Sequence, residues 1–210
     1  LTPGSTITWG GLWSWGRNDS GQLGLGNKTY YSSPKQVGAL TNWSSVSCGY
    51  AHNLSIKTDG TLWSWGYNNF GQLGLGNITN YSSPKQVGAL TTWSSIASGG
   101  NHTVSIKTDG TLWSWGQNGS GQLGQGNVTN YSSPKQVGAL TNWLSVSCGY
   151  RHTVSIKTNG TLWSWGSNNN GQLGLGNTTY YSSPKQVGAL TSWTKLFKGS
   201  TSSFTLAISS

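Results

Sequence analysis

The sequence predicts an all-β protein, a β-propeller built from four blade repeats of 50 residues each. The first observation is one string, Tyr-Ser-Ser-Pro-Lys-Gln-Val-Gly-Ala-Leu, which begins at Tyr31, Tyr81, Tyr131 and Tyr181 with no insertion or deletion between copies. The second is the composition, with 32 glycines and 13 tryptophans among 210 residues, which favours short strands and tight turns. No segment carries a helical period. We therefore expect modules that each bury an apolar face against the next.

The second copy illustrates the expected strands. Residues 61–66 alternate, which places Trp63 and Trp65 on one face of a strand. The preceding Asp-Gly pair at 59–60 predicts a hairpin to residues 53–56. These two strands form the centre of the expected blade.

Two more strands complete the expected blade. The glycine-rich segment 71–77 is expected to be an irregular loop, and residues 84–87 a short edge strand. Residues 93–97 form the next strand. Three or four strands in 50 residues is the content of one propeller blade.

The chain is expected to form one repeat domain, and its ends suggest circular closure. The fourth copy stops before a Trp-Ser-Trp strand, and residues 11–16 supply such a strand without a preceding hairpin partner. With the 50-residue period, residues 204–208 align with 154–158. We therefore expect the N- and C-terminal strands to share the closing blade, either within one chain or between neighbouring molecules. The domain is 1–210, with repeats at approximately 11–60, 61–110, 111–160 and 161–210 after a divergent segment 1–10.

These motifs resemble the repeat of the regulator of chromosome condensation (RCC1-like) family. The resemblance rests on the run from Asp59 to Asn77, the Ser-Ser-Pro-Lys-Gln-Val string and the run from Ser147 to Thr158, and it covers nearly the whole chain. It implies a β-propeller but no single function, because the family includes exchange factors, ubiquitin-ligase domains, photoreceptors and plain repeat proteins. The best-known members have seven repeats, whereas four are present here. We expect neither the insertion of the exchange factors nor the basic tail of the chromatin binders.

Catalytic, cofactor and metal sites are not expected. The chain has no Glu, and its acidic residues are Asp19, Asp59 and Asp109, of which the last two lie in expected hairpin turns. The Gly-Gln-Leu-Gly motif lacks the Lys-Ser/Thr of a phosphate loop, so structural glycines are the better interpretation. Three histidines recur at equivalent places, with Ser202 in the fourth, and we expect hydrogen bonding in the core rather than zinc binding. They are His52, His102 and His152.

The two cysteines allow two interpretations. Cys48 and Cys148 are equivalents two repeats apart, and they would face each other only in a four-bladed ring. Either a disulfide, within a small ring or between molecules, or two buried free thiols is compatible with this spacing.

Charge and hydropathy limit the partners. The net charge is +9, but the lysines repeat with the period, so they are expected around a rim rather than along a groove. Solvated edge lysines are the favoured interpretation, and a nucleic-acid partner is not expected. No run of 18 apolar residues is present, and residues 1–10 lack the features of a signal peptide, so no membrane span is expected.

Asn-x-Ser/Thr sequons recur at one place in every copy. They make Asn27, Asn77, Asn127 and Asn177 candidate glycosylation sites. Low charge and abundant Ser, Thr and Asn then favour an extracellular or particle-surface location.

The uniform copies favour a non-enzymatic structural propeller that self-associates or decorates a filament or virion surface. Its partners would be itself or another surface protein. One alternative is a lectin-like propeller that binds carbohydrate, and another is a chromatin or small-G-protein regulator of the better-known family type. The Trp-Ser-Trp pairs are expected in the core. The candidate interface aromatics are Trp9, Tyr30, Tyr31, Tyr81, Tyr131 and Tyr180.

Overall fold

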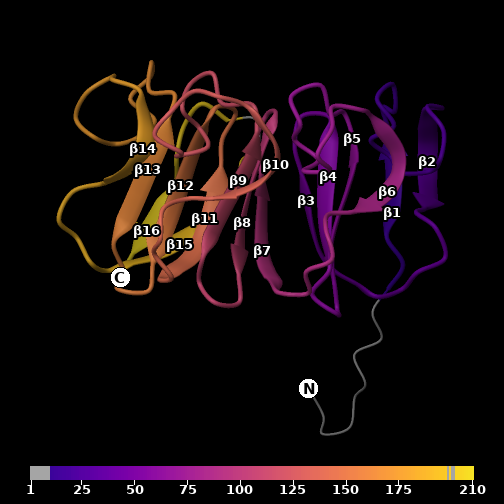
Figure 1. Ribbon diagram of the computed structural model, residues 1–210, viewed down its shortest axis with the longest axis horizontal. Coiled ribbons are helices and arrows are strands. Elements are labelled where there is room, and N and C mark those ends of the chain that lie inside the picture. Colours follow the sequence, from indigo (N-terminus) through magenta and orange to yellow (C-terminus); the bar gives the residue numbers. More distant parts are fainter. Residues whose placement is uncertain (1–9, 198, 200–201) are drawn as a thin grey trace, which may run out of the picture.

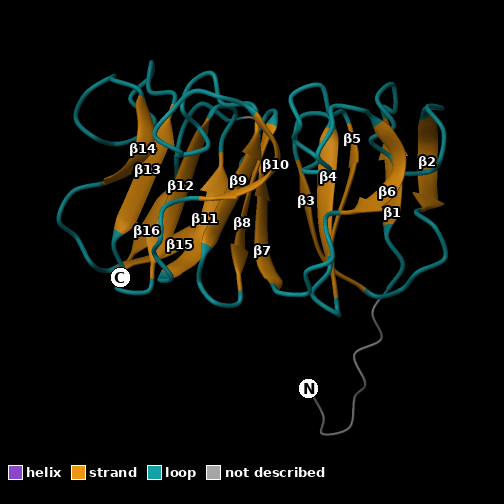
Figure 2. Cartoon of the chain, in the orientation of Figure 1, coloured by secondary structure: helices purple, strands orange, loops and turns teal. Residues whose placement is uncertain are grey.

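The computed structural model describes residues 10–197, 199 and 202–210. In this part of the chain every regular element is a β-strand and no helix is present. The sheets follow one another along the long axis of the molecule (Figures 1 and 2). The all-β repeat fold predicted from the period is confirmed.

Three complete antiparallel sheets each contain four consecutive strands, the content of one propeller blade. The first contains β3 (Trp43–Cys48), β4 (His52–Lys57), β5 (Leu62–Gly66) and β6 (Tyr81–Gln86). The second contains β7 (Trp93–Ser98), β8 (His102–Lys107), β9 (Leu112–Gly116) and β10 (Tyr131–Gln136). The third contains β11 (Trp143–Cys148), β12 (His152–Lys157), β13 (Leu162–Gly166) and β14 (Tyr181–Gln186). Each blade thus combines the second half of one repeat with the first half of the next.

A two-stranded sheet lies at each end of this series. β1 (Trp13–Gly16) pairs with β2 (Tyr31–Gln36), in the positions of β5 and β6. β15 (Trp193–Leu196) pairs with β16 (Ala207–Ser209), in the positions of β3 and β4. These four strands, which we call the divided blade, correspond to the two halves of a complete blade and lie toward opposite ends of the molecule (Figure 1). The terminal strands therefore do not share a sheet within this chain.

The hairpin between β4 and β5 depends on the Asp-Gly pair. Asp59 Oδ1 accepts hydrogen bonds from Thr61 N and Thr61 Oγ1, at 2.9 and 2.6 Å. Gly60 has φ +77°, and a Cβ there would lie 2.0 Å from the Thr91 carbonyl oxygen. Asn159 accepts the same two bonds in the third copy, which agrees with a turn requirement rather than a catalytic one.

A tryptophan cluster forms the centre of each complete blade. Trp43 packs against Trp63 and Trp65, with ring centroids 6.2 and 6.1 Å apart. The same trio recurs around Trp93 and Trp143. The core position expected for the paired tryptophans holds fully only for the second of each pair in these blades, because Trp65 and its equivalents are buried and Trp63 and its equivalents are half-buried. On β1 both Trp13 and Trp15 are exposed.

The glycine-rich loops join neighbouring blades. Trp65 Nε1 donates a hydrogen bond to the Gln22 carbonyl oxygen at 3.0 Å, across 43 residues of sequence. A Cβ at Gly24 would lie 2.8 Å from Trp65 Nε1, so the loop needs glycine to approach the ring. The later blades repeat this bond between Trp115 and Gln72 and between Trp165 and Gln122. The motif is thus a packing element.

The three histidines also connect blades. His102 Nε2 lies 3.1 Å from Thr153 Oγ1 of the next blade, and that hydroxyl donates to the Gln122 carbonyl oxygen at 2.8 Å. Because the hydroxyl proton is used in this way, the histidine must be the donor to Thr153. His52 makes the same connection to Thr103, and His152 to Thr205. The expected hydrogen-bonding role of these histidines is present in all three copies.

The hydrogen bond between His152 and Thr205 corrects the alignment of the C-terminal residues with the earlier repeats. Thr205 Oγ1 donates to the Gln172 carbonyl oxygen, as Thr153 does to Gln122. Thr205 therefore takes the place of Thr153 with a spacing of 52 rather than 50 residues. By the same count Phe204, not Ser202, takes the histidine position. The 50-residue register expected for residues 204–208 is thus wrong by two.

Candidate protein-binding surface

A repeated pair of side chains marks the outermost strand of every blade. Tyr31 and Lys35 lie on one face of β2 because they are four residues apart in a strand. Lys35 Nζ lies 5.6 Å from the centre of the tyrosine ring, within cation–π range. The lysine is exposed, and the tyrosine is half-buried. We call the repeated set the outer rim; it consists of Tyr31, Lys35, Tyr81, Lys85, Tyr131, Lys135, Tyr181 and Lys185.

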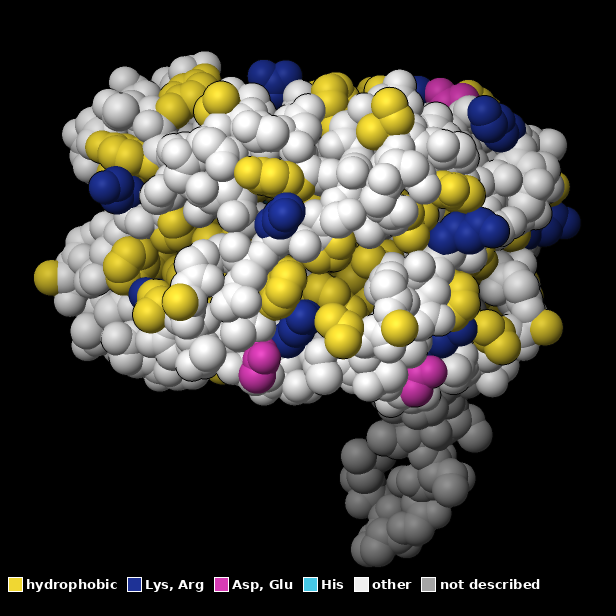
Figure 3. Space-filling view, viewed as in Figure 1, with side chains coloured by type: hydrophobic (Ala, Val, Ile, Leu, Met, Phe, Trp, Pro, Cys, Tyr) yellow, Lys and Arg dark blue, Asp and Glu magenta, His cyan; other side chains and the backbone are white. Residues whose placement is uncertain are grey.

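The outer rim distributes positive charge along the molecule. Lysine and arginine side chains are spread across the face seen in Figure 3, with hydrophobic side chains between them. The repeat in the sequence predicts these lysines on a rim but does not predict their pairing with the tyrosines. The four-residue separation within one strand was the signal for that pairing.

Sequon asparagines hold the outer rim in place. Asn27 Nδ2 donates to Tyr31 Oη at 3.2 Å, and Asn27 Oδ1 accepts from Thr29 N at 3.0 Å. Glycosylation would modify the same Nδ2 atom, so the structure favours a loop-forming role for this side chain. Equivalent bonds to the tyrosine hydroxyl are made by Asn77, Asn127 and Asn177.

The candidate interface aromatics do not all lie at the surface. Tyr30 and Tyr180 are exposed, as expected. Contrary to the expectation of exposure, Tyr31, Tyr81 and Tyr131 are half-buried in the outer rim. Trp9 lies outside the described residues.

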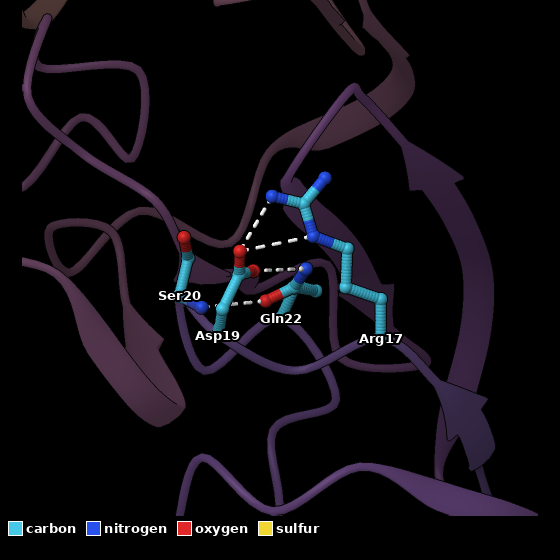
Figure 4. Close-up of polar contacts among 4 residues, drawn as sticks. All are labelled: Arg17, Asp19, Ser20 and Gln22. Carbon is cyan, nitrogen blue, oxygen red and sulfur yellow. Dashed lines mark hydrogen bonds and ion pairs between the residues drawn. The ribbon is translucent and has the colours of Figure 1, made fainter.

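Local hydrogen bonds neutralise or engage the acidic side chains. Asp19 Oδ2 accepts from Arg17 Nε at 2.9 Å, and Asp19 Oδ1 accepts from Gln22 Nε2 at 3.1 Å (Figure 4). The Arg17 contact lowers the pKa of the Asp19 carboxyl. Hydrogen bonds from Thr61 and Thr111 likewise lower the pKa values of Asp59 and Asp109 in their hairpins. The carboxylates are thus committed to local structure, and no salt bridge joins any of them to an outer-rim lysine among the described residues.

A second set of lysines is unavailable at the surface. Lys57 is buried, and its Nζ lies 3.6 Å from the centre of the Trp63 ring. Burial lowers the pKa of this lysine. Lys107 and Lys157 stack on Trp113 and Trp163 in the same way. In the three complete blades this stacking and the burial of Trp65 and its equivalents leave little of the Trp-Ser-Trp motif for a sugar ring, whereas the motif on β1 is exposed.

No disulfide joins the two cysteines, both of which lie in the described part of the chain. Cys48 is exposed on β3, whereas Cys148 is buried on β11 with its Sγ 3.6 Å from the Ala97 carbonyl oxygen. The same sequence position therefore has two environments.

A metal centre is not evident among the described residues, which hold no group of three or more His, Cys, Asp or Glu side chains placed for one. The search for helices long and apolar enough to cross a membrane also finds none in that part of the chain.

The repeated blades and their basic rim define a β-propeller of the tandem-repeat class. The family model for the RCC1-like domain matches residues 5–210, so the chain belongs to this family. Protein RCC2 of Mus musculus is 43% identical over 51 residues, which are 23% of this chain and 10% of that protein.

Solved structures give the same result. Human WBSCR16 superposes with a TM-score of 0.78 and 26% identity, covering 87% of this chain and 49% of that one. Prp20p of Saccharomyces cerevisiae, described with its binding to Gsp1p and histones, superposes with a TM-score of 0.77 and 25% identity. That match covers 86% of this chain and 47% of Prp20p. This chain therefore spans about half the length of these relatives.

These relatives correct the expected location. Prp20p binds histones, which are chromatin proteins, and yeast RCC1 (Prp20) has been solved bound to Kap60. The expectation of an extracellular or particle-surface location, which rested on composition and sequons, is therefore wrong. The composition was a poor guide to location because the Asn, Ser and Thr residues serve the fold, forming the hydrogen bonds within loops and between blades.

Proposed function

We propose that this chain is a non-enzymatic protein-binding propeller segment of the kind that regulates chromatin or small G proteins, and that its outer rim contacts an acidic surface of the partner. Membership of the RCC1-like family and the binding properties named for Prp20p support this class of function. Because the chain covers about half of that relative, the proposal concerns binding and not the activity of a whole propeller.

The observation that carries the proposal is the uncompensated charge of the outer rim. The chain has 12 Lys and Arg against 3 Asp, and each Asp is engaged locally, Asp19 by an arginine and the others within hairpins. Each outer strand therefore presents one exposed lysine stacked on a tyrosine. Such a row attracts an acidic surface and accelerates encounter with it. The tyrosines restrict the lysines and reduce the entropy lost on binding.

The proposal is tested by binding of the purified chain to immobilised Gsp1p and, separately, to histones. We expect binding to at least one of them that weakens as salt rises, because exposed charges are screened. Changing Lys35, Lys85, Lys135 and Lys185 together to Gln should weaken it at least about tenfold, or about 1.4 kcal/mol.

A matched control changes lysines away from the outer rim. Lys28→Gln with Lys195→Gln removes two exposed charges and is compared with Lys35→Gln with Lys85→Gln, which removes two charges from the outer rim. The first variant should leave binding within about twofold, and the second should weaken it more. Equal losses in both variants would assign the effect to net charge alone. No binding to either protein at low salt would reject the proposal.

A further inference from the structure

The sequence differences between the copies gather at one end of the complete blades. In the first of these blades His52 lies opposite Gly66, and Gly66 lies opposite Tyr81, so the segments that adjoin these residues share one end of the sheet. We call the surface that these segments form the loop face. In the three complete blades it consists of residues 49–51, 67–70, 78–80, 99–101, 117–120, 128–130, 149–151, 167–170 and 178–180.

Exposure alone does not explain where the copies differ. At the opposite end of the blades, residues 87–91 are identical in all four copies, although Leu90 is 49% exposed. Residues 58–61 of that end differ among the complete blades only where Asn159 replaces Asp. On the loop face the side chains change in size and polarity from blade to blade. The changes include Tyr67, Gln117 and Ser167 at one position and Ala51, Asn101 and Arg151 at another.

An invariant backbone framework holds these variable side chains. Tyr67 N donates a hydrogen bond to the Ala51 carbonyl oxygen at 2.8 Å, and the equivalent bonds in the second and third complete blades measure 2.9 and 2.8 Å. Asn68 Nδ2 donates to the Thr79 carbonyl oxygen at 2.9 Å, and the equivalent asparagines do the same. Loops that a rigid scaffold positions in this way are suited to recognition, because their side chains can change while the backbone stays fixed.

The loop face is continuous across the three complete blades. Tyr50 N donates to the Gly100 carbonyl oxygen at 3.3 Å, and Gly100 N donates to the Tyr150 carbonyl oxygen at 3.1 Å. A Cβ at Gly100 would lie 2.6 Å from Tyr150 Cδ2, so the glycine of the second blade makes room for the tyrosine ring of the third. The loop face also adjoins the outer rim, because Tyr81 directly follows Asn80. One partner can therefore cover both surfaces.

Arg151 is the one charged residue in the sequence of these loops. Its side chain is exposed, and its guanidinium carbon lies 5.5 Å from the centre of the Tyr150 ring. No salt bridge joins it to an acidic side chain in the described part of the chain. A guanidinium stacked on an aromatic ring keeps its N–H groups directed outward in the ring plane, where they can bind a carboxylate in bidentate fashion.

An aromatic pair lies on the loop face of the first complete blade. The rings of Tyr67 and Phe70 meet edge to face, with centroids 6.3 Å apart, and both side chains are half-buried. Aromatic and arginine side chains are enriched at the centres of protein interfaces, where they contribute most of the binding energy. The loop face thus combines an apolar contact with a single anchor for a carboxylate.

We propose that the loop face selects the protein partner, binding a surface on which a carboxylate reaches Arg151 and an apolar side chain packs against Tyr67 and Phe70. This inference rests on the proposed function and divides the binding between two surfaces. The outer rim is the same in every copy and attracts acidic proteins in general. The loop face differs in every copy and distinguishes one acidic protein from another, because a unique set of contacts fits only one of them.

The other copies supply the test substitutions, since each replacement already stands at an equivalent position of this chain. Arg151→Asn copies residue 101, Tyr67→Ser copies residue 167, and Phe70→Ser copies residue 120. Circular dichroism checks that the variants fold.

The experiment measures association and dissociation rates of the full 210-residue chain on immobilised Gsp1p and, separately, on histones. Arg151→Asn, and Tyr67→Ser combined with Phe70→Ser, should each dissociate at least about tenfold faster and associate within about threefold of the parent rate, because short-range contacts act on dissociation. The variant with all four outer-rim lysines changed to Gln should instead associate more slowly and lose salt dependence, because steering by charge acts on association.

Two matched controls lie away from the loop face. Leu144→Ser copies residue 94 at an exposed position near the start of β11, whereas the loop face follows the end of that strand. Lys195→Gln removes one exposed charge, as Arg151→Asn does. Both controls should dissociate as the parent does. A third variant, Leu90→Ser, probes the invariant end of the blades and should also behave as the parent.

The outcomes separate this inference from the function on which it rests. If the loop-face variants dissociate as the parent does while the outer-rim variant loses binding, the inference is overturned and the proposed function stands. Faster dissociation of Leu90→Ser alone, or equal effects in the loop-face variants and their controls, would also overturn the inference. Absence of binding to both Gsp1p and histones at low salt would reject the proposed function and this inference with it.

Discussion

Val46 and Val146 occupy the same position in two blades, yet Val46 is 49% exposed and Val146 is 3% exposed. Trp15 and Trp115 differ in the same way, at 58% and 0%. The local sequences are almost identical, so the difference comes from the neighbouring blade. Val146 and Trp115 are covered on one side by their own sheet and on the other by the preceding blade. In this fold burial is supplied by stacking, and the divided blade lacks half of it.

The largest expected effect concerns the histidines of the stacked region. Burial lowers the pKa values of His52 and His102 from 6.5 to about 3, and that of His152 to about 4. Each ring places Nδ1 without a hydrogen-bond partner among the described residues, so protonation would bury an uncompensated charge. The folded state therefore binds fewer protons than the unfolded one, and stability is complete above pH 6.5 and lost as pH falls toward 4.

Denaturant unfolding between pH 7 and pH 4.5 measures this loss. Each histidine should cost about 1.4 kcal/mol per pH unit below 6.5, or about 4 kcal/mol per unit for the three. His102→Phe, which copies the Phe204 of the divided blade, should reduce that slope by about one third. Stability that stays constant from pH 6.5 to pH 5 would show that the histidines are not buried as neutral groups.

A smaller effect separates the equivalent tryptophans. Trp115→Ala should lower the free energy of unfolding by about 3–5 kcal/mol, because it removes a fully buried ring and its bond to the Gln72 carbonyl oxygen. Trp15→Ala, measured in dilute protein, should cost less than about 1 kcal/mol. Urea titration of both variants gives the comparison. Similar losses would mean that the end of the chain is as well packed as its centre.

The period and the turn residues were sufficient to predict the strands. Alternation in residues 61–66 and the Asp-Gly pair at 59–60 act within one blade, where local rules apply. The connection from His102 through Thr153 to Gln122 could not be derived in this way, because it links three segments across blades. The shift of Thr205 to a spacing of 52 was missed because identity, not hydrogen bonding, set the alignment.

The candidate site was predicted less well than the fold. The outer-rim lysines were identified from the repeat. Their stacking on Tyr31 and its equivalents was not, because it depends on both side chains lying on one face of the outer strand. The exposure of Trp13, Trp15 and Cys48 was missed for a different reason. Their sequence matches that of buried copies, and only the arrangement of blades distinguishes them.

The central claim is that stacking between blades, and not the local sequence, decides which of the equivalent strands are buried. Amide hydrogen exchange tests it most directly, since pairing and burial protect amides. The amides of β8 and β12 should exchange slowly, while those of residues 12–15, whose sequence matches buried copies, should exchange much faster. Equal protection of the two sets would contradict the claim.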